Sequence, residues 1–114
     1  MPSPSADILA RLESTIAARR TAAPEASYVA QLHARGLPVI ARKLGEEGVE
    51  TLIAALSGSE QDLIAEAADL LFHLLVLLGA RDVPLEAVLA ELDRREGTSG
   101  LAEKAARHQR TQPR

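Results

Sequence analysis

Apolar residues recur along most of this chain at spacings of three and four, which is the period of an amphipathic α-helix. One such stripe lies within residues 5–20, and a shorter one begins after Ser27 and stops at Gly36. A third runs from Pro38 to about Leu56. Ser is a common N-cap, Pro fits the first turn and Gly fits the stop, so these residues mark predicted helix limits. The alternation typical of strands is absent from the sequence.

The segment from Ser59 to Gly79 is apolar on nearly every side of a helix. In a soluble protein this pattern indicates a helix that is buried on several sides. A chain of 114 residues has few other helices with which to cover it. We therefore expect a second copy of the chain to cover part of this helix, so that the predicted assembly is a homodimer.

Two further helices are predicted beyond this segment. One begins near Pro84 and stops before Gly97, and a short last helix is capped by Ser99. Residues 21–26 contain Pro24 and are predicted to form a linker. The predicted fold is therefore all-α, a bundle of about four to five helices that dimerisation completes.

The length of the chain suits a single domain, residues 1–114. Its core is expected to cover about residues 5–109, with disordered tails at residues 1–4 and 110–114. Apolar residues make up 46% of the sequence but aromatic residues only 2%. The core must therefore consist of Leu, Ala, Val and Ile, which is a helical composition.

Cysteine is absent, which excludes a disulfide framework, a zinc–thiolate site and a thiol nucleophile. The first residues do not resemble a signal sequence, and no uncharged stretch reaches the roughly 18 residues that span a bilayer. We therefore expect a soluble, cytoplasmic protein with no membrane partner.

The net charge of −3 conceals a strong separation of charge along the chain. Between Glu46 and Asp93 eleven residues are acidic and only Arg81 is basic, whereas six of the residues from Arg94 to Arg114 are basic. Either segment alone could be a solvated surface. Together they suit a ligand that combines a metal ion with phosphate, because carboxylates hold the cation and basic side chains hold the phosphate. Nucleic acid is not an expected partner, since most of the surface would repel a polyanion.

Two acid pairs are the candidate metal site. Glu47 and Glu50, and likewise Glu66 and Asp69, are three residues apart, so each pair lies on one helix surface. Like charges repel there, and a divalent cation would relieve the repulsion. Carboxylates are preferred ligands of Mg²⁺, which commonly joins them to substrate phosphates. Four carboxylates could hold one ion or two.

The alternative is that these acids are ordinary surface residues, which is the usual explanation of an isolated ExxE pair. Glu66 and Asp69 argue against it, because they are the only charged residues from Leu63 to Ala80. Burying unpaired carboxylates in such a helix would cost several kcal/mol. We expect these two acids to have the least access to solvent.

Three other polar residues are candidates for the site, and two of them have an alternative structural role. His73 lies on the same helical face as Asp69, where it is either a hydrogen-bonded core residue or a neighbour of the metal site. Lys43 either binds phosphate or pairs with Glu46 along the helix. Ser99 lies at a predicted helix start, where backbone N–H groups can bind an anion.

The sequence from Lys43 to Glu50, followed by Glu66 to His73, resembles the ExxE and ExxD signature of the all-α, MazG-like nucleotide pyrophosphohydrolases. Ser27-Tyr28 and the segment from Arg95 to Arg107 are similar to the phosphoribosyl-ATP pyrophosphatase branch, which belongs to histidine biosynthesis. The resemblance covers about residues 7–110. One departure is Gln31, where many members of the family have Lys.

The resemblance implies hydrolysis of phosphoribosyl-ATP to phosphoribosyl-AMP and pyrophosphate, with Mg²⁺ as cofactor and a homodimer completing the site. The implied catalytic residues are Glu46 and Glu47, where Glu46 is a further metal ligand or orients the attacking water. The implied metal ligands are Glu47, Glu50, Glu66 and Asp69. The implied substrate-binding residues are Lys43, Arg95, Ser99, Lys104 and Arg107.

Two other functions remain open at this stage. A MazG-like housecleaning pyrophosphatase for ordinary nucleoside triphosphates would keep the four acids without needing the segment from Arg95 to Arg107. A noncatalytic dimerisation module would leave the acids solvated. The number of ions, the acid that activates water and the contribution of each subunit are not determined by the sequence.

Overall fold

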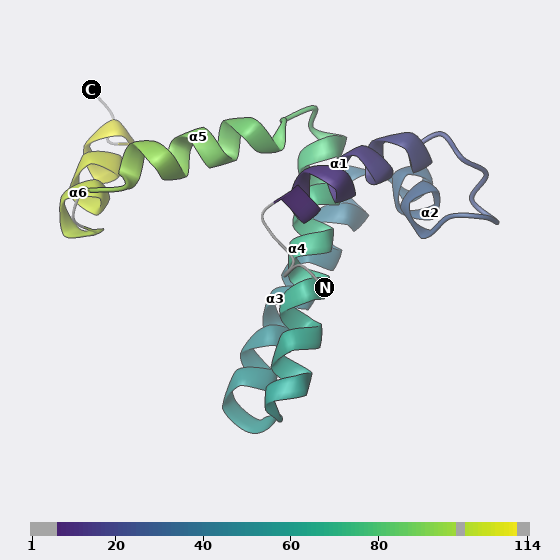
Figure 1. Ribbon diagram of the computed structural model, residues 1–114, viewed down its shortest axis with the longest axis horizontal. Coiled ribbons are helices and arrows are strands. Elements are labelled where there is room, and N and C mark those ends of the chain that lie inside the picture. The colour runs from purple at the N-terminus through teal and green to yellow at the C-terminus, as the bar shows by residue number, and fades with distance from the viewer. Residues whose placement is uncertain (1–6, 98–99, 112–114) are drawn as a thin grey trace.

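The computed structural model describes residues 7–97 and 100–111, which form six α-helices (Figure 1). The helices are α1 (Asp7–Arg19), α2 (Tyr28–Arg35), α3 (Leu37–Ser57), α4 (Glu60–Ala80), α5 (Leu85–Arg95) and α6 (Gly100–Thr111). No strand occurs among the described residues, so the all-α prediction is confirmed.

The antiparallel hairpin of α3 and α4 is the centre of the fold (Figure 1). Local sequence specifies its turn. Gly58 ends α3, and a Cβ atom there would lie 3.0 Å from the carbonyl oxygen of Ala54, so the close approach favours glycine. Ser59 and Asp62 then form a reciprocal capping box at the start of α4. Helix α3 ends and α4 begins within one residue of the predicted limits, about Leu56 and Ser59.

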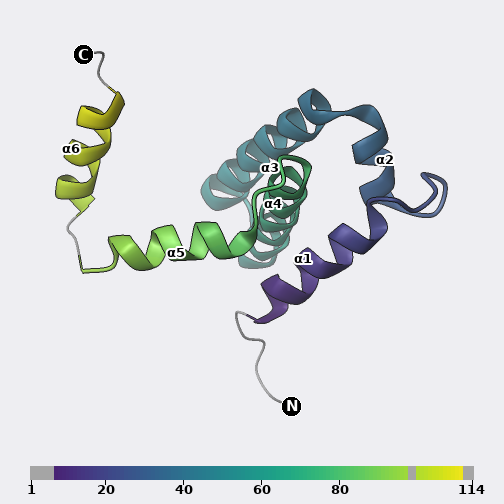
Figure 2. The same ribbon diagram turned by 90° about the horizontal axis from the view of Figure 1, so that it is seen from above.

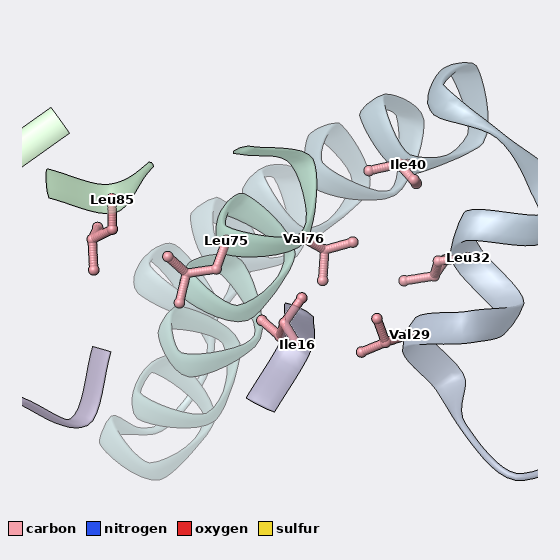
Figure 3. Packing of buried hydrophobic residues seen from close by; sticks show 7 residues of the cluster. All are labelled: Ile16, Val29, Leu32, Ile40, Leu75, Val76 and Leu85. Carbon is pink, nitrogen blue, oxygen red and sulfur yellow. The ribbon is translucent and has the colours of Figure 1, made fainter. Parts of the chain in front are cut away.

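Helices α1 and α2 pack against the open end of this hairpin. Ser27 caps α2, its hydroxyl accepting a hydrogen bond from the backbone N–H of Ala30 at 3.3 Å, as predicted. Gly36 separates α2 from α3 with φ = 96°, a backbone conformation that residues other than glycine rarely adopt. The buried apolar cluster lies where these helices meet (Figure 3); its residues are Ile16, Val29, Leu32, Ile40, Leu75, Val76 and Leu85.

Helices α5 and α6 extend away from this bundle (Figure 2). The first residue of α5 is tied to it: Leu85 is buried, and its backbone N–H donates to the carboxylate of Glu13 at 2.7 Å. The bundle of four to five helices thus corresponds to α1–α4 with the start of α5. Helix α6 continues to Thr111, two residues past the predicted end of the core, and the predicted cap Ser99 lies outside the described residues.

Much of the apolar surface of α3 and α4 is exposed in the single chain. Near the turn, where the hairpin stands free of the other helices in Figure 1, Leu56 is 79% exposed and Ile64 is 62% exposed. By length and composition alone α4 could cross a membrane, and only 17% of its most apolar stretch is buried. A core helix of a soluble protein passes the same test. The burial of α4 on several sides is therefore not achieved within one protomer.

Candidate active site

Three carboxylates from α3 and α4 meet midway along the hairpin. One oxygen from each of Glu47, Glu66 and Asp69 lies within 4.8 Å of the others. Glu47 reaches this point because it belongs to the least exposed stripe of α3, whose positions alternate in spacing between four and three and therefore face one side. The stripe consists of Ile40, Leu44, Glu47, Thr51 and Ala54.

The electrostatics of this carboxylate cluster, Glu47, Glu66 and Asp69, favour a cation. The Oε2 atoms of Glu47 and Glu66 are buried without a hydrogen-bond partner among the described residues. Burial raises the pKa of both side chains, and a hydrogen bond with Glu50, which requires a shared proton, raises each pKa further. When all are ionised they repel. Glu50 thus adjoins the cluster as a fourth acid, and the donor set fits Mg²⁺.

The acids that are most buried in the structure are not the ones that the sequence predicts. Glu66 and Asp69 were expected to be the least solvated acids, but Asp69 is exposed and Glu66 is half-buried. Glu47 is the buried one, at 6% exposure. That expectation is wrong because no described helix other than α3 covers the first half of α4 in Figure 1, whereas Glu47 belongs to the stripe of α3 that faces α4.

A groove of about 260 Å³ continues from the carboxylate cluster toward the hairpin turn. Its walls include Glu50 and Glu66 at one end and Gly58 and Asp62 at the other. Glu50 and Glu66 therefore line open space rather than a closed core, and a phosphate-bearing ligand has access to this side of the carboxylate cluster.

The raised pKa values of Glu47 and Glu66 predict how the stability of the metal-free protein depends on pH. Their stabilising contribution is complete below the ordinary carboxyl pKa of 4.5 and is lost as pH rises through the raised folded-state values. Metal-free protein is thus destabilised at pH 7 by these acids. Mg²⁺ at one hundred times its dissociation constant is expected to stabilise the fold by about 2.7 kcal/mol.

Thermal unfolding between pH 5 and 8, with EDTA or with Mg²⁺, measures this effect. Burial and Arg20 lower the pKa of His33, so the contribution of His33 makes the folded protein more stable as pH rises toward 6.5. This trend is opposite to that of the two acids. The comparison must therefore be between the unmodified chain and Glu66→Gln, whose difference in stability should shrink as pH falls. If Mg²⁺ did not change the midpoint of thermal unfolding at any pH, a metal site at these acids would be contradicted.

Glu46 lies outside the carboxylate cluster. It forms ion pairs with Lys43 at 3.4 Å and Arg42 at 3.7 Å. The pKa of Lys43 is raised, first by Tyr28, whose phenolate would attract the ammonium at high pH, and then by Glu46 and Glu47. Lys43 therefore pairs with Glu46 along the helix, and its ammonium is also attracted by Glu47 of the cluster.

His73 is a hydrogen-bonded core residue. Its Nδ1 lies 2.8 Å from the carbonyl oxygen of Asp69, which can only accept, so Nδ1 carries the proton. Nε2, 3.0 Å from the Tyr28 hydroxyl, then accepts from that group. The role of Tyr28 as a support for His73 was not predicted, although Ser27-Tyr28 belonged to the family resemblance. Gln31 likewise has a structural contact, donating to the carbonyl oxygen of Pro24 at 2.8 Å.

Within the single chain, the described part of the basic segment does not reach the acids. Arg95 lies on α5, where it donates to Glu91 at 3.0 Å; hydrogen bonds from Arg94 and Arg95 lower the pKa of Glu91 to about 2. Lys104 and Arg107 lie on α6, which Figures 1 and 2 both place far from the middle of the α3–α4 hairpin.

Comparison with known proteins identifies the family. The family model described as phosphoribosyl-ATP pyrophosphohydrolase matches residues 9–96. The chain is 67% identical to the phosphoribosyl-ATP pyrophosphatase of Novosphingobium aromaticivorans over 101 residues, covering 89% of this chain and 94% of that protein. It is 55% identical to the enzyme of the same name from Paracoccus denitrificans over 107 residues, covering 94% and 99%. This chain therefore belongs to the phosphoribosyl-ATP pyrophosphohydrolase family.

Proposed function

We propose that this protein is a cytoplasmic hydrolase that converts phosphoribosyl-ATP to phosphoribosyl-AMP and pyrophosphate in histidine biosynthesis, with Mg²⁺ as cofactor. The observation that carries the proposal is the carboxylate cluster, in which two buried oxygens have no hydrogen-bond partner in the described part of the chain. Membership of the family supports the substrate.

The acids of α3 and α4 are the proposed metal ligands. Glu47, Glu66 and Asp69 would hold Mg²⁺ directly, and Glu50 would complete the set from its place beside Glu47 and Glu66. When bound, Mg²⁺ neutralises charge on phosphate oxygens and polarises the phosphoryl group. The carboxylates also exclude competing anions from the hairpin until a cation is present.

Side chains of the site also bind the substrate and accept the proton that the attacking water loses. Water adds to one phosphorus of the α–β link, the bond from that phosphorus to the bridging oxygen breaks, and pyrophosphate leaves. The proton of the water passes to a carboxylate of the cluster, where Glu47 is the proposed catalytic residue. Because Glu46 pairs with Lys43, we assign it to positioning that ammonium against phosphate instead of orienting water.

A homodimer would bring the two halves of the site together. The acids and Lys43 lie on the hairpin, whereas Arg95, Lys104 and Arg107 lie on the helices that extend from it. A second copy would cover the exposed apolar residues of the hairpin and place its own α5 and α6 near these acids. Ser99, the remaining proposed phosphate contact, lies outside the described residues.

Product release from a panel of substrates tests the function. Pure protein with Mg²⁺ is incubated with phosphoribosyl-ATP and, separately, with simple nucleoside triphosphates, and pyrophosphate is measured. Release from phosphoribosyl-ATP at least about 100-fold faster is expected, because a site built for specific polar contacts rejects ligands that lack them. Hydrolysis in ¹⁸O-labelled water then shows which phosphorus accepts the water. Release only from the simple triphosphates would favour a housecleaning pyrophosphatase.

A further inference from the structure

Thr51 joins the backbones of two acids of the carboxylate cluster. Its hydroxyl lies 2.8 Å from the carbonyl oxygen of Glu47 on its own helix and 3.2 Å from the carbonyl oxygen of Glu66 on α4. Carbonyl oxygens only accept, so the single hydroxyl proton is shared between them. Thr51 is half-buried on the α3 stripe that faces α4, one helical turn after Glu47.

The second of these two contacts is what makes the residue unusual. A threonine that donates to the carbonyl four residues earlier is an ordinary helix feature, and Thr15 does the same on the exposed side of α1, with Arg11 at 3.1 Å. Thr51 also reaches across to α4. Carbonyls within a helix already accept a backbone N–H, so neither Glu47 nor Glu66 needs this hydroxyl to be satisfied. Its main consequence is to set how far apart the two backbones lie.

We propose that Thr51 is a positioning residue of the metal site, holding α3 and α4 at the separation at which their carboxylates can share one cation. This inference rests on the proposed function. Mg²⁺ requires near-ideal octahedral geometry with oxygens at about 2.0–2.1 Å, so a small change in helix separation weakens its binding. Ionised carboxylates on the two helices repel one another, and the hydrogen bond from Thr51 to the Glu66 carbonyl opposes a separation of the helices at that level.

The test compares Thr51→Val with Thr51→Ser. Valine keeps the shape and the helix propensity of threonine but cannot donate, whereas serine keeps the hydroxyl. Mg²⁺ binding to the metal-free proteins is measured by titration calorimetry, together with their thermal unfolding in EDTA. Thr51→Val is expected to weaken Mg²⁺ binding about tenfold or more, in line with other residues that orient metal ligands. Thr51→Ser should bind within about threefold of the unmodified chain.

Thr15→Val is the matched control, because it removes the same bond along a helix with no contact to a second helix. It should leave Mg²⁺ affinity unchanged. Thr51→Ala gives a second variant without the hydroxyl if Thr51→Val fails to fold. Equal Mg²⁺ affinity in the unmodified, Val and Ala proteins would overturn the role of Thr51 while leaving the metal site intact. An unmodified protein that binds no Mg²⁺ would overturn the proposed function first, and this inference with it.

Discussion

Glu47→Gln is expected to lower kcat/KM for phosphoribosyl-ATP by more than about 100-fold, which exceeds the usual loss from residues that only support a metal ligand. Glutamine keeps the shape of the side chain but removes the charge, and Glu47 is the acid that the fold directs between α3 and α4. Pyrophosphate release at saturating Mg²⁺ measures the loss. Mg²⁺ binding by calorimetry should weaken in parallel.

The same substitution is expected to stabilise the metal-free protein. A neutral amide at this position removes the cost of burying a charge and the repulsion from Glu50 and Asp69. Thermal unfolding in EDTA should therefore show a higher midpoint for Glu47→Gln at pH 7, and added Mg²⁺ should narrow the difference.

Glu25→Gln is the control, since it removes the same charge from an exposed position in the linker between α1 and α2. It should change neither activity nor midpoint appreciably. If Glu47→Gln retained full turnover and Mg²⁺ binding, the noncatalytic dimerisation module would be the better explanation of this fold.

Mixing two inactive variants is expected to restore activity. Glu47→Gln damages the acids, and the double variant Lys104→Ala with Arg107→Ala damages the basic segment, so each alone should lose more than about 100-fold in kcat/KM. If each site takes its acids from one subunit and α6 from the other, a mixed dimer contains one intact site. After random subunit exchange, about a quarter of the unmodified activity should return.

The control mixes Glu47→Gln with Asp69→Asn. Both substitutions lie in the carboxylate cluster, so every site in the mixed dimer carries one damaged acid and no activity should return. Size-exclusion chromatography confirms that each variant still forms the same assembly. Absence of recovery in the first mixture would mean that α6 serves the acids of its own chain, or that its basic residues are not required.

The family model clarifies which part of the sequence identifies the family. It matches residues 9–96, a range that contains the acids, Tyr28 and Arg95 but not Lys104 or Arg107. We had expected the segment from Arg95 to Arg107 to carry the specific assignment. The family is recognised without the part that follows residue 96, so the roles of Lys104 and Arg107 depend on the mixing experiment.

Helix limits were predictable to within a few residues because they depend on neighbours in the sequence. Ser27, Gly36 and Ser59 act on groups no more than four residues away. The acid pairs were visible for the same reason, since residues three apart share a helix surface. Thr51 also belongs to the least exposed stripe of α3, but its spacing alone gives no indication of a contact with α4.

The sequence by itself determined the six helices, the two acid pairs and the excess of apolar surface on α4, because each follows from periodicity, capping and composition over short distances. Only the tertiary structure decided that Glu47 is the buried acid, that Tyr28 supports His73, and that Thr51 links the backbones of Glu47 and Glu66. These facts depend on how α3 packs against α4 and α2 against both. Such packing joins residues as distant in sequence as Tyr28 and His73, which are 45 positions apart, and no local pattern can specify it.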